Sequence, residues 1–274
     1  AGEETEVLIN KFSLPFNRHH ARSTAGLNWL TDEVVNFHAS LVNDRELQAM
    51  DTEKRERQVW VPNSFFITKL SEDDGYNYSN VRRWSKRAKV DIFSLRVMLM
   101  HINVNKDHWT CAAIDFSKKT ITYYDSRGDD GTAIDIYKGK DSQEYNTVNI
   151  FDLLRNYLRD EHNDKEDIPW DDAGWENVIP GNTVPQQTNG SDCGVFASQF
   201  INYLATNDAF DFTQDDMPRI RQQMLLEILD GQLKAAENLT VEWEKTKIES
   251  IVTKKTYRKT LLVARAAFAN PYSS

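Results

Sequence analysis

The stretch HWTCAAIDFSKKTITYYD, residues 108–125, decides the fold class. Its two halves, 108–116 and 120–125, are rich in apolar, aromatic and β-branched residues, and the short polar link 117–119 joins them. This pattern predicts a β-hairpin. Residues 95–104, just upstream, have the same strand character. We therefore expect these segments to form the centre of a sheet.

The ends of this hairpin carry two residues with acid–base chemistry. His108 opens the first strand and Asp125 closes the second, so an antiparallel hairpin brings both to the same end of the sheet. A carboxylate beside an imidazole fixes the tautomer and favours the imidazolium. Separately, either residue could be an ordinary strand or turn residue. Together they predict a base and the group that orients it.

A second constellation lies around Cys193. Apolar residues at helical spacing predict a helix over 193–206, which puts Cys193 at its positive N-terminus, where the pKa of a thiol falls. Asp192 is placed to cap this helix, and Gly194 leaves room for a substrate backbone. The Gln187 amide could donate to an oxyanion together with the Cys193 N–H. A lone cysteine is more often a buried structural thiol, so only the full set indicates a thiol protease.

The other elements follow from periodicity and turn residues. Thr31 can cap a helix that continues through Leu41, and residues 60–70 are left unassigned. Further helices are expected at 78–89, 148–162 and 215–229, strands at 8–15 and 175–180, and a polar loop at 128–146.

Composition excludes several functional classes. The formal net charge of −9 argues against binding nucleic acid through phosphate contacts, and no apolar run is long enough to span a membrane. The two cysteines form no zinc pattern and suggest a reducing compartment, with Cys111 in the core. No phosphate loop or calcium loop is found. We expect no metal and no cofactor.

Several longer segments resemble the SUMO-specific (sentrin/ubiquitin-like-specific) cysteine proteases. The resemblance runs from about residue 14 to 229 and is carried by GLNWLTDEVVNF at 26–37, VRRWSKRAKVDIFS at 81–94, HWTCAAIDFSKKTITYYDSRG at 108–128, VPQQTNGSDCGVFASQF at 184–200 and FTQDDMPRIRQQMLLEIL at 212–229.

The resemblance implies an α+β, papain-like cysteine protease fold with permuted connectivity, in which a central mixed sheet is flanked by helices. It makes His108, Asp125 and Cys193 the triad and Gln187 the oxyanion donor. Such an enzyme hydrolyses the bond after the C-terminal Gly-Gly of SUMO, in deconjugation from target lysines and in precursor maturation.

The resemblance also assigns residues that bind the substrate. Trp29 and Trp109 would close over the Gly-Gly tail, because two indole faces make a slot that only glycine can thread. Asp32 would pair with a basic residue of the modifier, and Gly194 lies beside the nucleophile. SUMO or SUMO-conjugated proteins are the implied partners of a monomeric, intracellular enzyme that is nuclear or at the nuclear envelope, with the cytoplasm as an alternative.

Some features depart from the family pattern. The segment 101–108 looks longer than in relatives, and 127–147 carries an insertion next to the triad strands. We expect a catalytic domain at 1–233 and a C-terminal extension of unknown role at 234–274. Three alternatives stay open: the same chemistry on another ubiquitin-like modifier, acyl transfer instead of hydrolysis, and a catalytically silent modifier-binding module.

Overall fold

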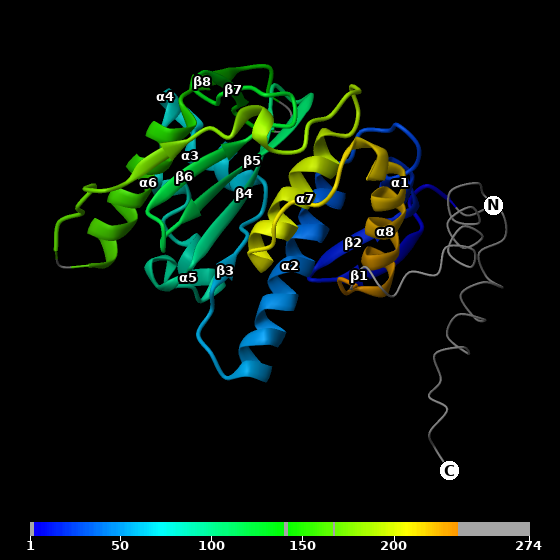
Figure 1. Cartoon of the computed structure of the whole chain (residues 1–274), viewed down its shortest axis with the longest axis horizontal. Helices are drawn as coiled ribbons and strands as arrows, with labels where there is room; N and C mark the ends of the chain where they lie inside the picture. Colours follow the sequence, from blue (N-terminus) through cyan, green and yellow to red (C-terminus); the bar gives the residue numbers. More distant parts are fainter. Residues whose placement is uncertain (1–2, 140–141, 167, 235–274) are drawn as a thin grey trace, which may run out of the picture.

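The computed structural model describes residues 3–139, 142–166 and 168–234 (Figure 1). At its centre is a five-stranded sheet in the order β3-β4-β5-β6-β9. Its strands are β3 (Val59–Trp60), β4 (Val97–Val104), β5 (His108–Asp115), β6 (Thr120–Tyr124) and β9 (Glu176–Val178). The three middle strands are antiparallel, and the two edge strands pair in parallel, so the sheet is mixed.

The alternation of side chains along β4 and β5 produces two hydrophobic cores. Leu99, Cys111 and Ala113 point to one face, while Met98 and Ile114 point to the other. Because successive residues of a strand face opposite sides, strands buried on both faces read as continuous apolar runs. This explains why all eight residues of β5 are buried.

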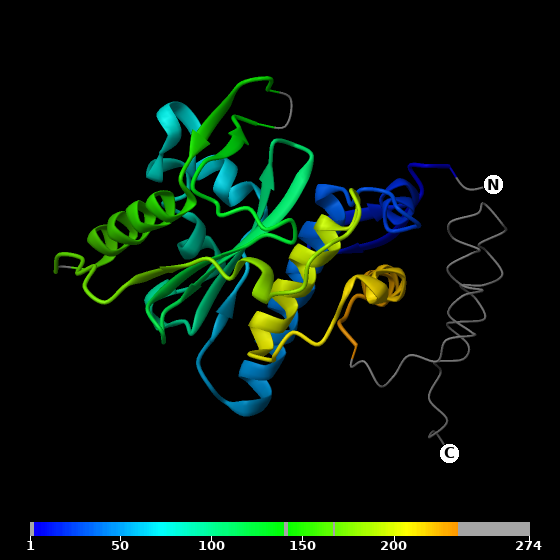
Figure 2. The same cartoon turned by 45° about the horizontal axis from the view of Figure 1, so that its top comes forward.

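Helices cover each face of the sheet. On one side, α2 (Asp32–Glu53) and α7 (Cys193–Thr206) lie side by side, and α7 packs directly on β4 and β5 (Figure 2). Beyond them lie α8 (Met217–Asp230), α1 (Arg18–Ser23) and the hairpin β1 (Val7–Lys11) and β2 (Leu14–Asn17). The other side carries α3 (Phe65–Leu70), α4 (Glu72–Gly75), α5 (Trp84–Ala88) and α6 (Ile150–Lys165).

The structure corrects three local predictions. The segment 128–146 is not simply a loop, because β7 (Ile134–Tyr137) and β8 (Tyr145–Val148) form a further hairpin within and just after it. The strand expected at 8–15 is two strands, since Phe12 and Ser13 adopt left-handed backbone angles and turn the chain. The helix expected at 78–89 is a short 3₁₀ turn followed by α5.

The main architecture agrees with the sequence. The hairpin β5–β6 and the helices α2, α6, α7 and α8 fall where periodicity placed them, and the central mixed sheet flanked by helices is confirmed. No helix among residues 3–139, 142–166 and 168–234 is long and apolar enough to cross a membrane. The division at residue 233 stays a prediction, because the proposed extension lies, beyond Lys234, outside the described residues.

Candidate active site

The hairpin brings His108 and Asp125 together as predicted. His108 Nε2 donates to Asp125 Oδ1 over 2.8 Å, and both side chains are buried. The register pairs Cys111 with Tyr124, and its continuation places Asp125 opposite Thr110. His108 is therefore a diagonal neighbour on the same strand face, within reach of a long side chain. The Arg127 N–H also donates to Asp125 Oδ1, over 2.7 Å, and holds the carboxylate in place.

Cys193 begins α7, beside the imidazole. His108 Nδ1 is buried and makes no hydrogen bond in the described part of the chain, so this nitrogen is available to take the proton of the neighbouring Cys193 thiol. Burial acts to raise the pKa of Cys193, but the His108 side chain and the Trp109 backbone N–H outweigh this and lower the pKa below its ordinary value.

The imidazole shifts in the complementary direction. Burial acts to lower the pKa of His108, but the hydrogen bond to Asp125 and the adjacent Cys193 raise the pKa to about 9. The lowered pKa of the thiol and the raised pKa of the imidazole both shift the equilibrium toward the thiolate–imidazolium pair. The site can therefore supply a nucleophile and a general acid at once.

The loop before Cys193 holds Gln187. The Gln187 side chain accepts from Ser126 Oγ over 2.6 Å and donates to the Asn189 carbonyl over 2.6 Å. A primary amide has two donor hydrogens, so one is left to donate elsewhere. Its use on an oxyanion remains a prediction that this geometry allows.

Asp192 does not act as the predicted helix cap. It occupies the N-cap position of α7, yet its side chain makes no capping hydrogen bond. Its Oδ1 instead meets Arg221 Nε and Nη2 at 2.7 and 2.6 Å, and its Oδ2 accepts from Asn189 and Gln214. Arg221 Nη2 also donates to the Ser191 carbonyl over 2.8 Å. We call the cluster of Asn189, Ser191, Asp192, Gln214 and Arg221 the loop brace; its ion pair, Asp192 with Arg221, is buried.

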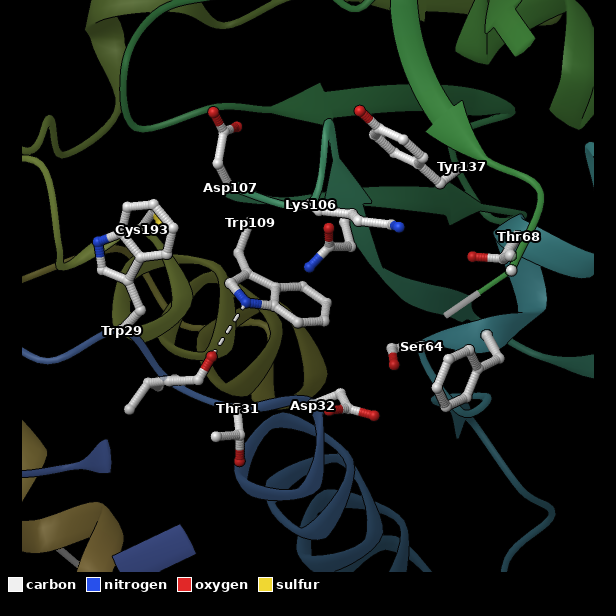
Figure 3. A pocket seen from close by; sticks show the side chains of 14 residues that line it. Trp29, Thr31, Asp32, Ser64, Thr68, Lys106, Asp107, Trp109, Tyr137 and Cys193 are labelled. Atoms are coloured by element: carbon white, nitrogen blue, oxygen red, sulfur yellow. Dashed lines mark hydrogen bonds between the residues drawn. The ribbon is translucent and has the colours of Figure 1, made fainter. Parts of the chain in front are cut away.

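Both predicted substrate tryptophans line one groove with Cys193 (Figure 3). Trp109 is 6% exposed and donates through Nε1 to the Leu30 carbonyl, whereas Trp29 is 53% exposed and donates to the Gly190 carbonyl. Asp32, the first residue of α2, lies in the same groove. The structure thus brings Trp29, Trp109 and Asp32 together with the nucleophile, and their contact with a substrate stays a prediction.

The structure gives a reason for the glycine at position 194 that the sequence did not suggest. A Cβ on this residue would lie 3.1 Å from Leu30 Cβ and 3.2 Å from Trp109 Cδ1. Its missing side chain therefore lets α7 pack closely against Trp109. These contacts explain the glycine by the packing of the protein itself, and they do not test the expectation that Gly194 leaves room for a substrate backbone.

Sequence reasoning missed two parts of this region. Arg221 was read as one residue of an amphipathic helix, although it falls on the buried stripe of α8. A cation on such a stripe indicates a buried partner and could have been noticed. The sequence did not indicate the far side of the groove, which Lys106 and Tyr137 form, because this side depends on the hairpin β7–β8, which was not predicted. No group of three or more metal-binding side chains occurs among the described residues.

Comparison with known proteins places this site in a family. The model of the Ulp1 protease family, C-terminal catalytic domain, matches residues 28–233. A sentrin-specific protease of Caenorhabditis elegans is 31% identical over 234 residues, 85% of this chain and 30% of that protein. Sentrin-specific protease 2 of Homo sapiens is 31% identical over 233 residues, 85% of this chain and 35% of that protein. The chain thus spans about a third of the length of these curated relatives.

Solved structures show the same fold. The C-terminal Ulp1 protease domain in complex with Smt3, the yeast ortholog of SUMO, superposes with a TM-score of 0.64 at 29% identity, covering 85% of this chain and 91% of that one. The SUMO protease Ulp1 with its catalytic cysteine oxidised to a sulfinic acid gives a TM-score of 0.62 at 28% identity, with the same coverage of 85% and 91%. These matches confirm the predicted α+β cysteine protease fold, and the chain belongs to the Ulp1 protease family, whose C-terminal catalytic domain it contains.

Proposed function

We propose that this chain is a cysteine-type SUMO-specific peptidase that hydrolyses the bond after the C-terminal Gly-Gly of SUMO and releases it from target lysines. Maturation of SUMO precursors is a second reaction for the same site. One observation carries the proposal: a buried Asp125–His108 pair acts on a Cys193 thiol of lowered pKa inside a groove lined by two tryptophans.

The first half of the reaction uses the ion pair. The Cys193 thiolate attacks the carbonyl carbon of the last glycine, a C–S bond forms, and the carbonyl electrons move to oxygen. The Cys193 N–H and the free hydrogen of the Gln187 amide donate to this oxyanion. When the C–N bond breaks, the His108 imidazolium gives its proton to the leaving lysine amine.

Hydrolysis then restores the enzyme. Neutral His108 takes a proton from water as the water attacks the thioester, and the C–S bond breaks to return the thiolate. Asp125 keeps Nε2 of the imidazole occupied throughout, so Nδ1 stays directed to the chemistry. No step requires a metal or a cofactor.

The groove supports selectivity for glycine. Trp29 and Trp109 line it near the nucleophile, and a residue with a side chain would meet an indole where glycine passes. An acyltransferase would not need a slot that admits only a Gly-Gly tail, so the slot argues against the acyl-transfer alternative. A silent binding module is disfavoured too, because binding alone needs neither the raised pKa of His108 nor the lowered pKa of Cys193.

The relatives support further proposals on the partner, the oligomeric state and the cellular location of this enzyme. Two of them are named as sentrin-specific proteases, and one structure holds a SUMO ortholog. We extend this to a monomeric enzyme that acts on SUMO conjugates in the nucleus or at the nuclear envelope. Residues 1–233 would be its catalytic unit.

A covalent probe tests the proposal directly. SUMO carrying a C-terminal propargylamide should label the wild type at Cys193, and a chelator should not reduce the labelling. Cys193→Ala should abolish it, while Cys111→Ala, which removes the other thiol, should leave it intact. Stronger labelling by ubiquitin or by another Gly-Gly probe than by SUMO would point to a different modifier, and equal labelling by all probes would contradict specificity for SUMO. No labelling by any probe would refute the enzyme assignment.

A further inference from the structure

The groove that contains Cys193 extends well beyond the tryptophan slot. Its far side is formed by Lys106, in the turn between β4 and β5, and by Tyr137 and Gly139, at the end of β7 (Figure 3). In that view Trp29 and Cys193 lie at one end, Tyr137 and Thr68 at the other, and Trp109 lies between them. We call Lys106 and Tyr137 the hairpin wall.

The hairpin wall is held firmly by the rest of the protein. Ile134 and Ile136 point inward and are buried in the core that lies beneath β7. The Asn105 N–H donates to the Asp135 carbonyl over 2.9 Å, which links the β4–β5 turn to β7. Asn146, on β8, donates to the Ser71 carbonyl over 2.7 Å. The wall is therefore preformed, and little ordering entropy is lost when a partner binds to it.

The alternation along β7 turns Tyr137 away from the core. Since Ile136 is inward, the next residue faces the groove. The Lys106 ammonium lies 4.3 Å from the centroid of the Tyr137 ring and donates to the Ser142 carbonyl. Tyr145, the cross-strand partner, packs against Tyr137 with ring centroids 5.7 Å apart. Tyr137 is thus a fixed aromatic surface with a cation over it, as found at protein-binding sites.

The size of the groove decides what can occupy it. Its volume is about 290 Å³, which suits a peptide tail or a small ligand but not a folded domain. A chain that threads between Trp29 and Trp109 remains attached to its folded body, which must lie over the groove's mouth. The hairpin wall borders that mouth and is continuous with the slot.

We infer that Lys106 and Tyr137 dock the folded body of the modifier whose Gly-Gly tail lies in the slot, and so help to select which modifier is cleaved. This inference rests on the proposed function. The hairpin overlaps the segment 127–147, which the sequence predicts to be an insertion, so we expect the contact made by Tyr137 to be one that this chain adds to the site. A contact at the wall that is equally strong in the ground state and in the transition state lowers KM and leaves kcat unchanged.

Two fluorogenic substrates separate recognition from chemistry. One is full-length SUMO with a C-terminal coumarin, and the other is a short peptide ending in Gly-Gly with the same coumarin. For Tyr137→Ala we expect a rise of about tenfold in KM for the SUMO substrate, with the kcat/KM of the peptide kept within about twofold. Thr147→Ala, at an exposed position of β8 that lies outside the groove and does not contact Tyr137, is the matched control and should keep the wild-type KM for both.

The outcomes distinguish this inference from the proposed function. An unchanged KM for SUMO in Tyr137→Ala, with wild-type cleavage intact, would overturn the docking role alone. Equal losses on SUMO and on the peptide would also overturn it, because the tyrosine would then act on the triad or on folding. If the wild type cleaves neither substrate, the proposed function itself fails, and the inference with it.

Discussion

The two halves of the active site are held in different ways. The His108–Asp125 half sits on neighbouring strands of one hairpin, so its geometry follows from local register. The Cys193 half depends on the loop brace, in which Arg221 of α8 lies 29 residues after its partner Asp192 in the chain. Damage to the first half should therefore remove chemistry and spare the fold, whereas damage to the second should cost stability and placement together.

The largest expected effect is on the hairpin half. His108→Ala removes the general acid and base and also the group that lowers the pKa of Cys193. We expect kcat for the SUMO–coumarin substrate to fall by about 10⁴-fold, the upper end for such a group. The unfolding temperature should fall less than in Arg221→Met, because the Arg127 N–H still donates to the Asp125 carboxylate when the imidazole is gone.

The control is another histidine. His19→Ala, on the exposed part of α1, should keep wild-type kcat. A large drop in unfolding temperature for His108→Ala would contradict the comparison, since both halves would then be structural.

The loop brace should respond through stability. Arg221→Met leaves the Asp192 carboxylate buried without its cation, which costs about 3–5 kcal/mol in the free energy of unfolding. The same carboxylate, no longer neutralised beside Cys193, should raise the pKa of the thiol. Denaturant unfolding and the pH dependence of iodoacetamide alkylation measure the two effects.

A double variant and a neighbouring arginine sharpen this result. Asp192→Asn combined with Arg221→Met removes the charge and should recover part of both losses. Arg219→Met, whose exposed pair with Asp216 lies on the same helix, should cost under about 1 kcal/mol. If Arg221→Met behaves like Arg219→Met, the loop does not depend on the brace.

A variant of Gln187 tests whether this residue of the loop contributes to the chemical step rather than to stability. Gln187→Ala should lower kcat about 10²–10³-fold with little change in KM, because an oxyanion donor acts mainly in the transition state. The control for loop disruption is Gln186→Ala, because the amide of this preceding residue donates to backbone carbonyls, those of Gly181 and Val184 and, over 3.4 Å, that of Asp125. Equal losses in both variants would mean that Gln187 holds the loop and does not donate to the substrate.

The smallest effect concerns histidines whose pKa values move in opposite directions. Burial lowers the pKa of His38 to about 4 and the pKa of His101 to about 3, so both are neutral when folded. The unfolded chain takes up these protons below about pH 6.5, so stability falls as the pH drops, by about 2 kcal/mol per histidine at pH 5. Because the pKa of His108 is raised, its contribution is present at acid pH and is lost as the pH rises through about 9.

Urea unfolding at pH 7 and pH 5 measures this dependence. His38→Leu removes one group that has no hydrogen-bond partner in the described chain, and should reduce the acid loss by about 2 kcal/mol. An unchanged loss would show that other groups cause the acid sensitivity.

These contrasts explain what the sequence could predict. Strand character and a three-residue link were enough to place His108 beside Asp125, and helical spacing placed Cys193 at the start of α7. The loop brace could not be predicted, because no local pattern says which distant cation Asp192 meets. The hairpin β7–β8 was missed because its polar, glycine-containing sequence hides two inward isoleucines within a short strand.

The close packing of Gly194 against Trp109 has a mechanical consequence. The helix that carries the nucleophile and the indole that bounds the slot touch with no room to spare. Widening the passage for a bulkier tail would therefore shift the sulfur, and moving the sulfur would alter the passage. Variants engineered to accept tails other than Gly-Gly should therefore lose turnover as they gain binding of bulkier tails, because the contact between Gly194 and Trp109 determines both the width of the slot and the position of the sulfur.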